Sequence, residues 1–213
     1  MKIIALNGSP KKERNTAFLL NAVLKTAEGA GAQTELIQLV DFNIKACIGC
    51  NKCLRAGICA IQDDDMNILA EKMLDADGIV LGSPTYFMNV SGIMKNFIDR
   101  TRPLHMYQNK LKGKIGGAVT VAGMRHGGQE FVIDYLERFM RSHGMILVDG
   151  MEPPTTEPRM LFTGGAIGTI YKGMEEDNVV WSRSVSEDGA AIKGANFLAE
   201  NMVYLINKLG KVY

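Results

Sequence analysis

Short apolar runs alternate with amphipathic helical patterns along most of the chain, and this alternation constrains the fold more than any other feature. The runs are continuously apolar, which is typical of strands buried on both faces. They predict strands at residues 2–6, 34–39, 78–82, 115–121 and 145–148, and helices at 15–27, 93–102, 129–142 and 189–209. A further helix, ending near residue 74, follows Asp63-Asp64-Asp65, which we expect to cap it from solvent.

Strands that alternate with helices imply a parallel sheet covered on both faces. Five such strands suit an α/β, flavodoxin-like three-layer sandwich with strand order 2-1-3-4-5. We expect residues 1–213 to form a single domain of this kind, with a cysteine loop at about 45–62 and an irregular insertion at about 150–188. Structureless segments of that length are uncommon in compact domains, so the insertion is expected to be functional or an interface arm.

The charge balance and the apolar runs limit the possible partners. Lysine and arginine number 24 and the acidic residues 23, a balance that gives no reason to expect nucleic acid or an anionic membrane as partner. No apolar run reaches the roughly 18 residues that span a bilayer. The chain begins directly with a strand pattern rather than a signal peptide. We therefore expect a cytoplasmic protein.

The turn after the first predicted strand, residues 8–16, carries side chains suited to a phosphate group. It leads into a helix N-terminus, where free amide groups and the helix dipole bind anions. The segment matches neither a P-loop nor a dinucleotide loop, and an ordinary polar turn with helix caps is an open alternative. The candidate phosphate-binding residues are Ser9, Pro10, Lys11, Arg14, Asn15, Thr16 and Ala17.

Two later loops have the chemistry to hold a flat, polar-edged ring. Residues 83–92 follow the third predicted strand and combine aromatic surface with hydrogen-bonding side chains, although the aromatic pair has core packing as its alternative. Residues 122–130 follow the fourth strand, and their glycines allow the backbone to approach a ligand closely. The candidate flavin-binding residues are Pro84, Thr85, Tyr86, Phe87, Met88, Asn89, Ala122, Gly123, Arg125, Gly127 and Gly128.

Together the three loops predict one bound mononucleotide, with phosphate at the first loop and a ring at the other two. No residue is assigned a proton-transfer role. Three segments, Gly8-Ser9-Pro10 with Asn15-Thr16, Ser83 to Tyr86, and Gly127 to Glu130, resemble the NADPH-dependent FMN reductase superfamily over about residues 1–150. This resemblance implies a flavodoxin-like fold, bound FMN and a homodimer or homotetramer.

All four cysteines lie within a stretch of 13 residues, in the pattern C-x2-C-x2-C-x5-C. Clustered cysteines in a cytosolic chain indicate a metal or redox site rather than a disulfide framework. The first three have the spacing of a ferredoxin-like cluster loop, so we predict one 4Fe–4S cluster held by Cys47, Cys50, Cys53 and Cys59. Zinc, two disulfides and free thiols at a dimer contact remain alternatives.

A four-cysteine loop after the second strand resembles the iron–sulfur flavoproteins of anaerobic microbes. The resemblance implies one FMN and one 4Fe–4S cluster per subunit, with the cluster near a flavin across the subunit interface. The predicted function is electron transfer between two-electron and one-electron carriers, with a redox partner such as ferredoxin or NAD(P)H. The alternatives are an NAD(P)H-dependent FMN or quinone reductase without a functional cluster, and a redox-sensing or oxygen-scavenging module.

Overall fold

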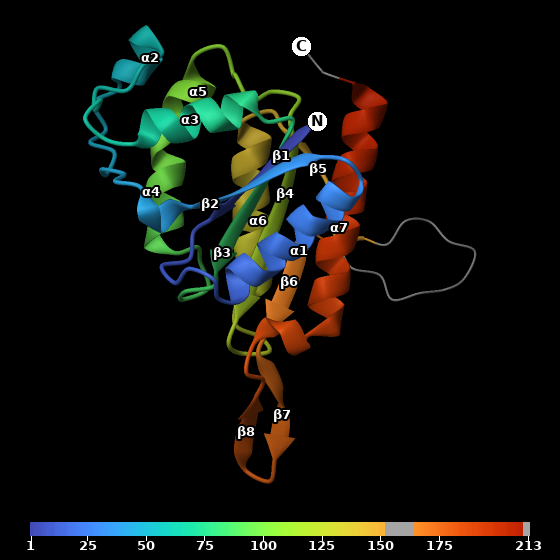
Figure 1. Ribbon diagram of the computed structural model, residues 1–213. Coiled ribbons are helices and arrows are strands. Elements are labelled where there is room, and N and C mark those ends of the chain that lie inside the picture. Colours follow the sequence, from blue (N-terminus) through green and yellow to red (C-terminus); the bar gives the residue numbers. More distant parts are fainter. Residues whose placement is uncertain (152–163, 211–213) are drawn as a thin grey trace.

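The computed structural model describes residues 1–151 and 164–210, which form a twisted parallel sheet between two layers of helices (Figure 1). The strand order is β2-β1-β3-β4-β5, which confirms the predicted flavodoxin-like order. The strands are β1 Lys2–Asn7, β2 Gln33–Gln38, β3 Gly78–Pro84, β4 Ile115–Ala122 and β5 Ile146–Leu147. No helix in these described ranges is both long enough and apolar enough to cross a membrane.

Each strand supplies apolar side chains to both faces of the sheet, because successive residues of a strand point in opposite directions. In β1, Ile3 and Ala5 join the core beneath α1 (Asn15–Gly29) and α7 (Gly189–Leu209). Ile4 and Leu6 join the opposite core, beneath α3 (Met66–Asp75), α4 (Gly92–Arg100) and α6 (Gln129–Ser142). This double burial explains why the strands have continuously apolar sequences.

Four short helices complete the described fold: α2 Lys52–Ala56, α5 Arg102–Met106, and the 3-10 helices η1 Leu39–Asp41 and η2 Val185–Glu187. The helix predicted at residues 93–102 is in fact two, because α4 ends at Arg100 and α5 begins at Arg102, with Pro103 in its first turn. α2 was not predicted. It lies inside the cysteine loop between Asn51 and Gly57, which both have left-handed backbones.

The fifth strand position is divided between two segments of the chain. β5 pairs with the beginning of β4, with Ile115 opposite Ile146, and β6 (Ala166–Thr169) pairs with the end of β4, with Val119 opposite Ala166. Gly165 allows this pairing, since a Cβ there would lie 2.1 Å from the Ala118 carbonyl oxygen. The predicted strand at 145–148 is therefore only the first half of the fifth strand position.

The expectation of an irregular insertion at 150–188 is wrong for its described part. After β6 comes an antiparallel hairpin of β7 (Tyr171–Glu175) and β8 (Asn178–Trp181), followed by η2. Figure 1 shows the hairpin projecting beyond one end of the sheet. Residues 152–163 of the expected insertion lie outside the described residues.

Candidate functional site

The three predicted ligand loops meet at one open pocket of about 680 Å³ at the carboxyl ends of β1, β3 and β4. Most of the polar candidates face this space. Its lining comprises Ser9, Lys11, Arg14, Asn15, Thr16, Pro84, Thr85, Tyr86, Val121, Ala122, Gly123 and Ile170. The loops predicted independently to hold a phosphate and a ring therefore form a single site.

Local hydrogen bonds shape the loop between β1 and α1 before any ligand arrives. The Ser9 amide donates to Asn7 Oδ1 at 3.0 Å, and the Lys11 amide donates to Ser9 Oγ at 3.1 Å. The Gly8 amide donates to the Gly82 carbonyl at 2.7 Å, which ties the loop to β3. Arg14 is the N-cap of α1 but makes no side-chain cap hydrogen bond, so the first amides of the helix are left for another acceptor.

The loop after β3 begins as a continuation of the sheet and ends in a tight turn. The Thr85 amide donates to the Val121 carbonyl at 2.9 Å, and Tyr86 and Asn89 exchange backbone hydrogen bonds around Phe87 and Met88. Phe87 is fully exposed and the Tyr86 side chain is 44% exposed. The alternative that these aromatic residues pack in the core is therefore wrong.

Gln129 organises the glycine-rich loop after β4, a role that sequence reasoning missed. Its side chain is buried, accepts from the Gly127 amide at 2.7 Å and donates to the Met124 carbonyl at 2.9 Å. Gly128 packs so tightly against Met88 that a Cβ there would lie 2.8 Å from its Cα. The loops after β3 and β4 thus support one another.

Eight of the predicted flavin-site residues do not line the pocket. Ala17 is buried on α1, and Gly127 and Gly128 make the loop contacts just described. The others lie on exposed turns beside the pocket or on the turn at 86–89: Pro10, Phe87, Met88, Asn89 and Arg125. Two lining residues were missed, Val121 at the end of β4 and Ile170, which the division of the fifth strand brings to the site.

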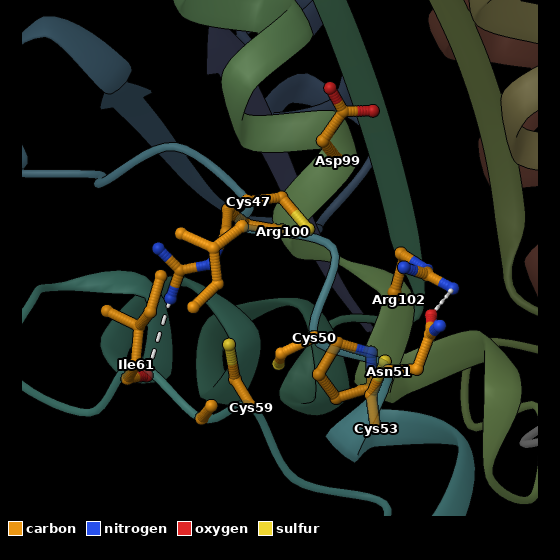
Figure 2. A pocket seen from close by; sticks show the side chains of 12 residues that line it. Cys47, Cys50, Asn51, Cys53, Cys59, Ile61, Asp99, Arg100 and Arg102 are labelled. Atoms are coloured by element: carbon orange, nitrogen blue, oxygen red, sulfur yellow. Dashed lines mark hydrogen bonds between the residues drawn. The ribbon is translucent and has the colours of Figure 1, made fainter.

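All four cysteines line a second pocket (Figure 2). Cys47 and Cys50 are exposed, Cys53 on α2 is buried and Cys59 is half-buried. All four are free thiols, so the disulfide alternative is wrong. The other lining residues come from the same loop and from α4 and α5: Ile48, Asn51, Ala60, Ile61, Asp99, Arg100, Arg102 and Pro103.

Residues with left-handed backbones bend the loop between the cysteines. Gly49, Asn51 and Gly57 have φ values of 65°, 58° and 65°. Arg102 Nη2 donates to Asn51 Oδ1 at 3.1 Å, which anchors the loop to α5 (Figure 2). Gly57 packs against Tyr107, since a Cβ there would lie 2.6 Å from the Tyr107 ring. The repeated turns bring the four thiols to a common space.

Arg100 forms the inner wall of the cysteine pocket. Its side chain is 1% exposed and pairs with Asp64, whose side chain is equally buried. Burial lowers the pKa of Arg100, but the Asp64 hydrogen bond and the negative charge of Cys59 outweigh that effect and raise it. Burial likewise raises the pKa of Asp64, and the hydrogen bonds from Arg100 and backbone amides outweigh it and lower the pKa. Asp64 accepts from the Met66 amide at the start of α3 at 3.3 Å, but it is buried there, so the expectation that this cap lies in solvent is wrong.

The residues around the cysteine pocket suit an anionic group bound through thiolates. The donor set is four thiols, and the Nε of Arg100 is buried there without a hydrogen-bond partner in the described part of the chain. Within residues 1–151 and 164–210, no three His, Cys, Asp or Glu side chains are grouped so as to hold a metal ion. Four thiols are the donor set of iron–sulfur clusters and also of structural zinc sites, so the donor chemistry of this pocket fits either group.

Comparison with known proteins identifies the family. Residues 1–155 match the family model described as NADPH-dependent FMN reductase. The chain belongs to this family. It is 40% identical over 203 residues to an iron–sulfur flavoprotein of Archaeoglobus fulgidus, a match that covers 95% of this chain and 94% of the relative. It is 45% identical over 153 residues to an iron–sulfur flavoprotein of Methanocaldococcus jannaschii, which covers 72% of this chain and 78% of the relative.

Solved structures agree with the flavodoxin-like fold. The crystal structure of RosB superposes with a TM-score of 0.72 at 17% identity, covering 100% of this chain and 81% of RosB. A flavodoxin, WrbA-like protein of Agrobacterium tumefaciens superposes with a TM-score of 0.60 at 15% identity, covering 97% of both chains. With the FMN reductase family shown, this chain is an FMN-dependent oxidoreductase among the iron–sulfur flavoproteins.

Proposed function

We propose that this chain is an electron-transfer flavoprotein with FMN in the pocket at the ends of β1, β3 and β4 and one 4Fe–4S cluster in the cysteine pocket. The observation that carries the proposal is that all four cysteines line one pocket beside the buried side chain of Arg100. When bound, FMN supplies one- and two-electron chemistry and the cluster supplies one-electron chemistry. The protein would thus couple the two modes of transfer.

The residues of the flavin pocket divide into a phosphate end and a ring end. At the phosphate end, the first amides of α1, the hydroxyls of Ser9 and Thr16, and the charge of Arg14 bind the phosphate. At the ring end, Tyr86 and Ile170 supply apolar surface, while Gly123 lets the backbone approach the polar edge of the ring.

In the cysteine pocket, Cys47, Cys50, Cys53 and Cys59 would hold the cluster as thiolates. The bends at Gly49, Asn51 and Gly57 direct the loop around it. Four thiolates concentrate negative charge, and Arg100 and Arg102 in the same lining offset part of that charge.

We also propose that the chain works as a homodimer or homotetramer. Large apolar side chains are exposed around both pockets: Ile48, Leu54 and Ile58 in the cysteine loop, and Phe87, Met88, Met124 and Trp181 near the flavin pocket. Exposed apolar patches of this kind are typical of interaction surfaces. The redox partner in this proposal is ferredoxin or NAD(P)H.

The test is anaerobic purification followed by analysis of flavin, iron and sulfide in the wild type and in Cys59→Ser. We expect about one FMN and about four iron and four sulfide per wild-type chain. The serine variant should keep its FMN and lose most of its iron, because the two pockets share no lining residue. Full FMN content with iron far below a complete cluster, even after anaerobic reconstitution, would refute the cluster and leave the flavin site standing.

A second candidate function is an NAD(P)H-dependent FMN or quinone reductase that needs no cluster. It is supported by the family itself and by 38% identity over 134 residues to an NAD(P)H dehydrogenase (quinone) of Chromohalobacter salexigens, a match that covers 61% of this chain and 62% of that protein. Rapid mixing of NADH or NADPH with Cys59→Ser discriminates the two. Full flavin reduction and unchanged quinone turnover without iron would favour the reductase.

A further inference from the structure

Arg100 and Asp64 form a buried ion pair that joins two distant segments of the chain beside the cysteine pocket. Arg100 is the last residue of α4, and Asp64 precedes α3, 36 positions earlier in the sequence. Burying two charges is costly unless both are well hydrogen-bonded. Here Arg100 lines the pocket that all four cysteines share, on the side of Cys47 and Cys59 (Figure 2).

The hydrogen bonds of the guanidinium group are satisfied on all sides but one. Nη1 donates to the Lys45 carbonyl at 2.6 Å and to Asp64, and Nη2 donates to Asp64 at 3.2 Å and to the Ile61 carbonyl at 3.4 Å. Nε, in contrast, is buried without a partner among the described residues. Cys59, which interacts with the Arg100 side chain by charge and by a hydrogen bond, is one of the four thiols that line the pocket, so the acceptor for this N–H is expected among the sulfur atoms of the site.

Lys45 and Ile61, which hold the guanidinium group from the two ends of the cysteine loop, flank Cys47 and Cys59 in sequence. Arg100 therefore fixes both ends of the loop as well as lining its pocket. The charge of Arg100 also interacts with Cys59. These contacts place the permanent positive charge of Arg100 and its Nε–H group beside the thiols of the pocket.

We propose that Arg100 is a positioning residue for the iron–sulfur cluster, donating its Nε–H to a sulfur of the bound group and raising the reduction potential of that group. This inference rests on the proposed function, since it requires a cluster in the cysteine pocket. Reduction adds one electron to the bound group, and a nearby buried cation stabilises the more negative state. Hydrogen bonds to the sulfur atoms act in the same direction.

Other charges in the lining differ from Arg100 in burial or in pairing. Arg102 lines the same pocket but is partly exposed, and it donates to Asn51, so solvent screens its charge. Asp99 also lines the pocket, and Lys95 pairs with it at 2.6 Å. Arg100 is thus the most deeply buried charged side chain in this lining.

The experiment compares the cluster midpoint potential of four proteins by anaerobic titration followed by electron paramagnetic resonance. Removing Arg100 alone would leave Asp64 buried and unpaired, so the test variant is Arg100→Gln with Asp64→Asn, which removes both charges and keeps hydrogen-bonding groups. Arg100→Lys keeps the charge and lacks the Nε–H. Arg55→Gln is the control, because Arg55 is an exposed arginine of the cysteine loop that lies outside the pocket lining.

We expect the double variant to fold, as judged by circular dichroism and FMN content, and to show a more negative potential or loss of iron. Arg100→Lys should shift in the same direction by a smaller amount, and it also serves as the test if the double variant does not fold. Arg55→Gln should stay close to wild type. Wild-type potential and iron content in both Arg100 variants would overturn the inference, whereas wild-type protein that binds no cluster would instead refute the proposed function.

Discussion

His143 provides a stability test with a defined pH window. It caps the C-terminus of α6, is 2% exposed, and lies edge-on to Phe139 with ring centroids 4.8 Å apart. The Thr101 hydroxyl donates to the Ile98 carbonyl at 2.8 Å, so His143 Nε2 is the donor in its 3.1 Å hydrogen bond to Thr101 Oγ1. Nδ1, which would take the second proton, is buried without a partner in the described ranges.

Burial, assisted by the charge of neighbouring His105, lowers the pKa of His143 from 6.5 to about 4. In the unfolded chain this histidine binds a proton once the pH falls below 6.5, while in the folded chain it stays neutral until about pH 4. Stability therefore decreases as the pH falls through this window and levels off below it. Since each tenfold change in proton affinity is worth about 1.4 kcal/mol, the loss is roughly 3 kcal/mol.

The assay is urea unfolding at pH 7, 6, 5 and 4.5 with saturating FMN, for wild type, His143→Gln and the control His126→Gln. The glutamine amide can still donate to Thr101 but cannot take a proton. We expect His143→Gln to be less stable than wild type at pH 7, by about 1–2 kcal/mol for lost packing, and the difference to shrink or reverse by pH 4.5. His126, in an exposed loop, should leave the wild-type pH dependence unchanged. Parallel curves for wild type and His143→Gln would refute the reasoning.

Two further predictions concern the flavin pocket and the divided strand. Arg14→Gln should weaken FMN binding roughly 10- to 100-fold in a fluorescence titration, which is the value of a charge-assisted hydrogen bond. Lys12→Gln should leave the affinity unchanged, because Lys12 pairs with Asp41 outside the pocket lining. Equal affinities in the two variants would contradict the assigned phosphate end. Gly165→Ala should lower the free energy of unfolding by about 2–4 kcal/mol, because the new methyl group would collide with the Ala118 carbonyl and separate β6 from β4. Gly189→Ala, with open space around its Cβ position, should stay within about 0.5 kcal/mol of wild type, and equal stabilities of the two alanine variants would show that the close approach at residue 165 is absent.

Local patterns were enough to predict the elements that build the flavin pocket. β1, β3 and β4 are buried on both faces, so each has an uninterrupted apolar sequence, and the loops that follow them must meet at one edge of a parallel sheet. The third strand continues to Pro84, beyond the predicted end at residue 82, because Pro84 still pairs with Val121. Strand direction and loop chemistry together were therefore sufficient to locate the site.

Features that depend on contacts between distant segments were not predictable. Asp64 has the sequence context of a helix cap, and only the arrival of Arg100 from α4 shows that it is buried. β6 spans four residues, Ala166–Thr169, with alternating buried and half-buried positions, too short and too small in side-chain size for a strand pattern. Ile170 reaches the flavin pocket only because β6 completes the fifth strand position.

The arrangement of the two pockets bears on how electrons would pass between them. The flavin pocket lies at the carboxyl ends of β1, β3 and β4, where Ile170 leads into the β7–β8 hairpin. The cysteine pocket is built on α2 and α5, which Figure 1 shows near the opposite end of the sheet, and the two linings share no residue. A direct route within one chain would have to cross the helix layer, while a second copy could bring its flavin pocket against an exposed cysteine loop. Homo-oligomer formation is therefore part of the proposed electron transfer, and the exposed apolar side chains around both pockets are the surfaces through which the copies would meet.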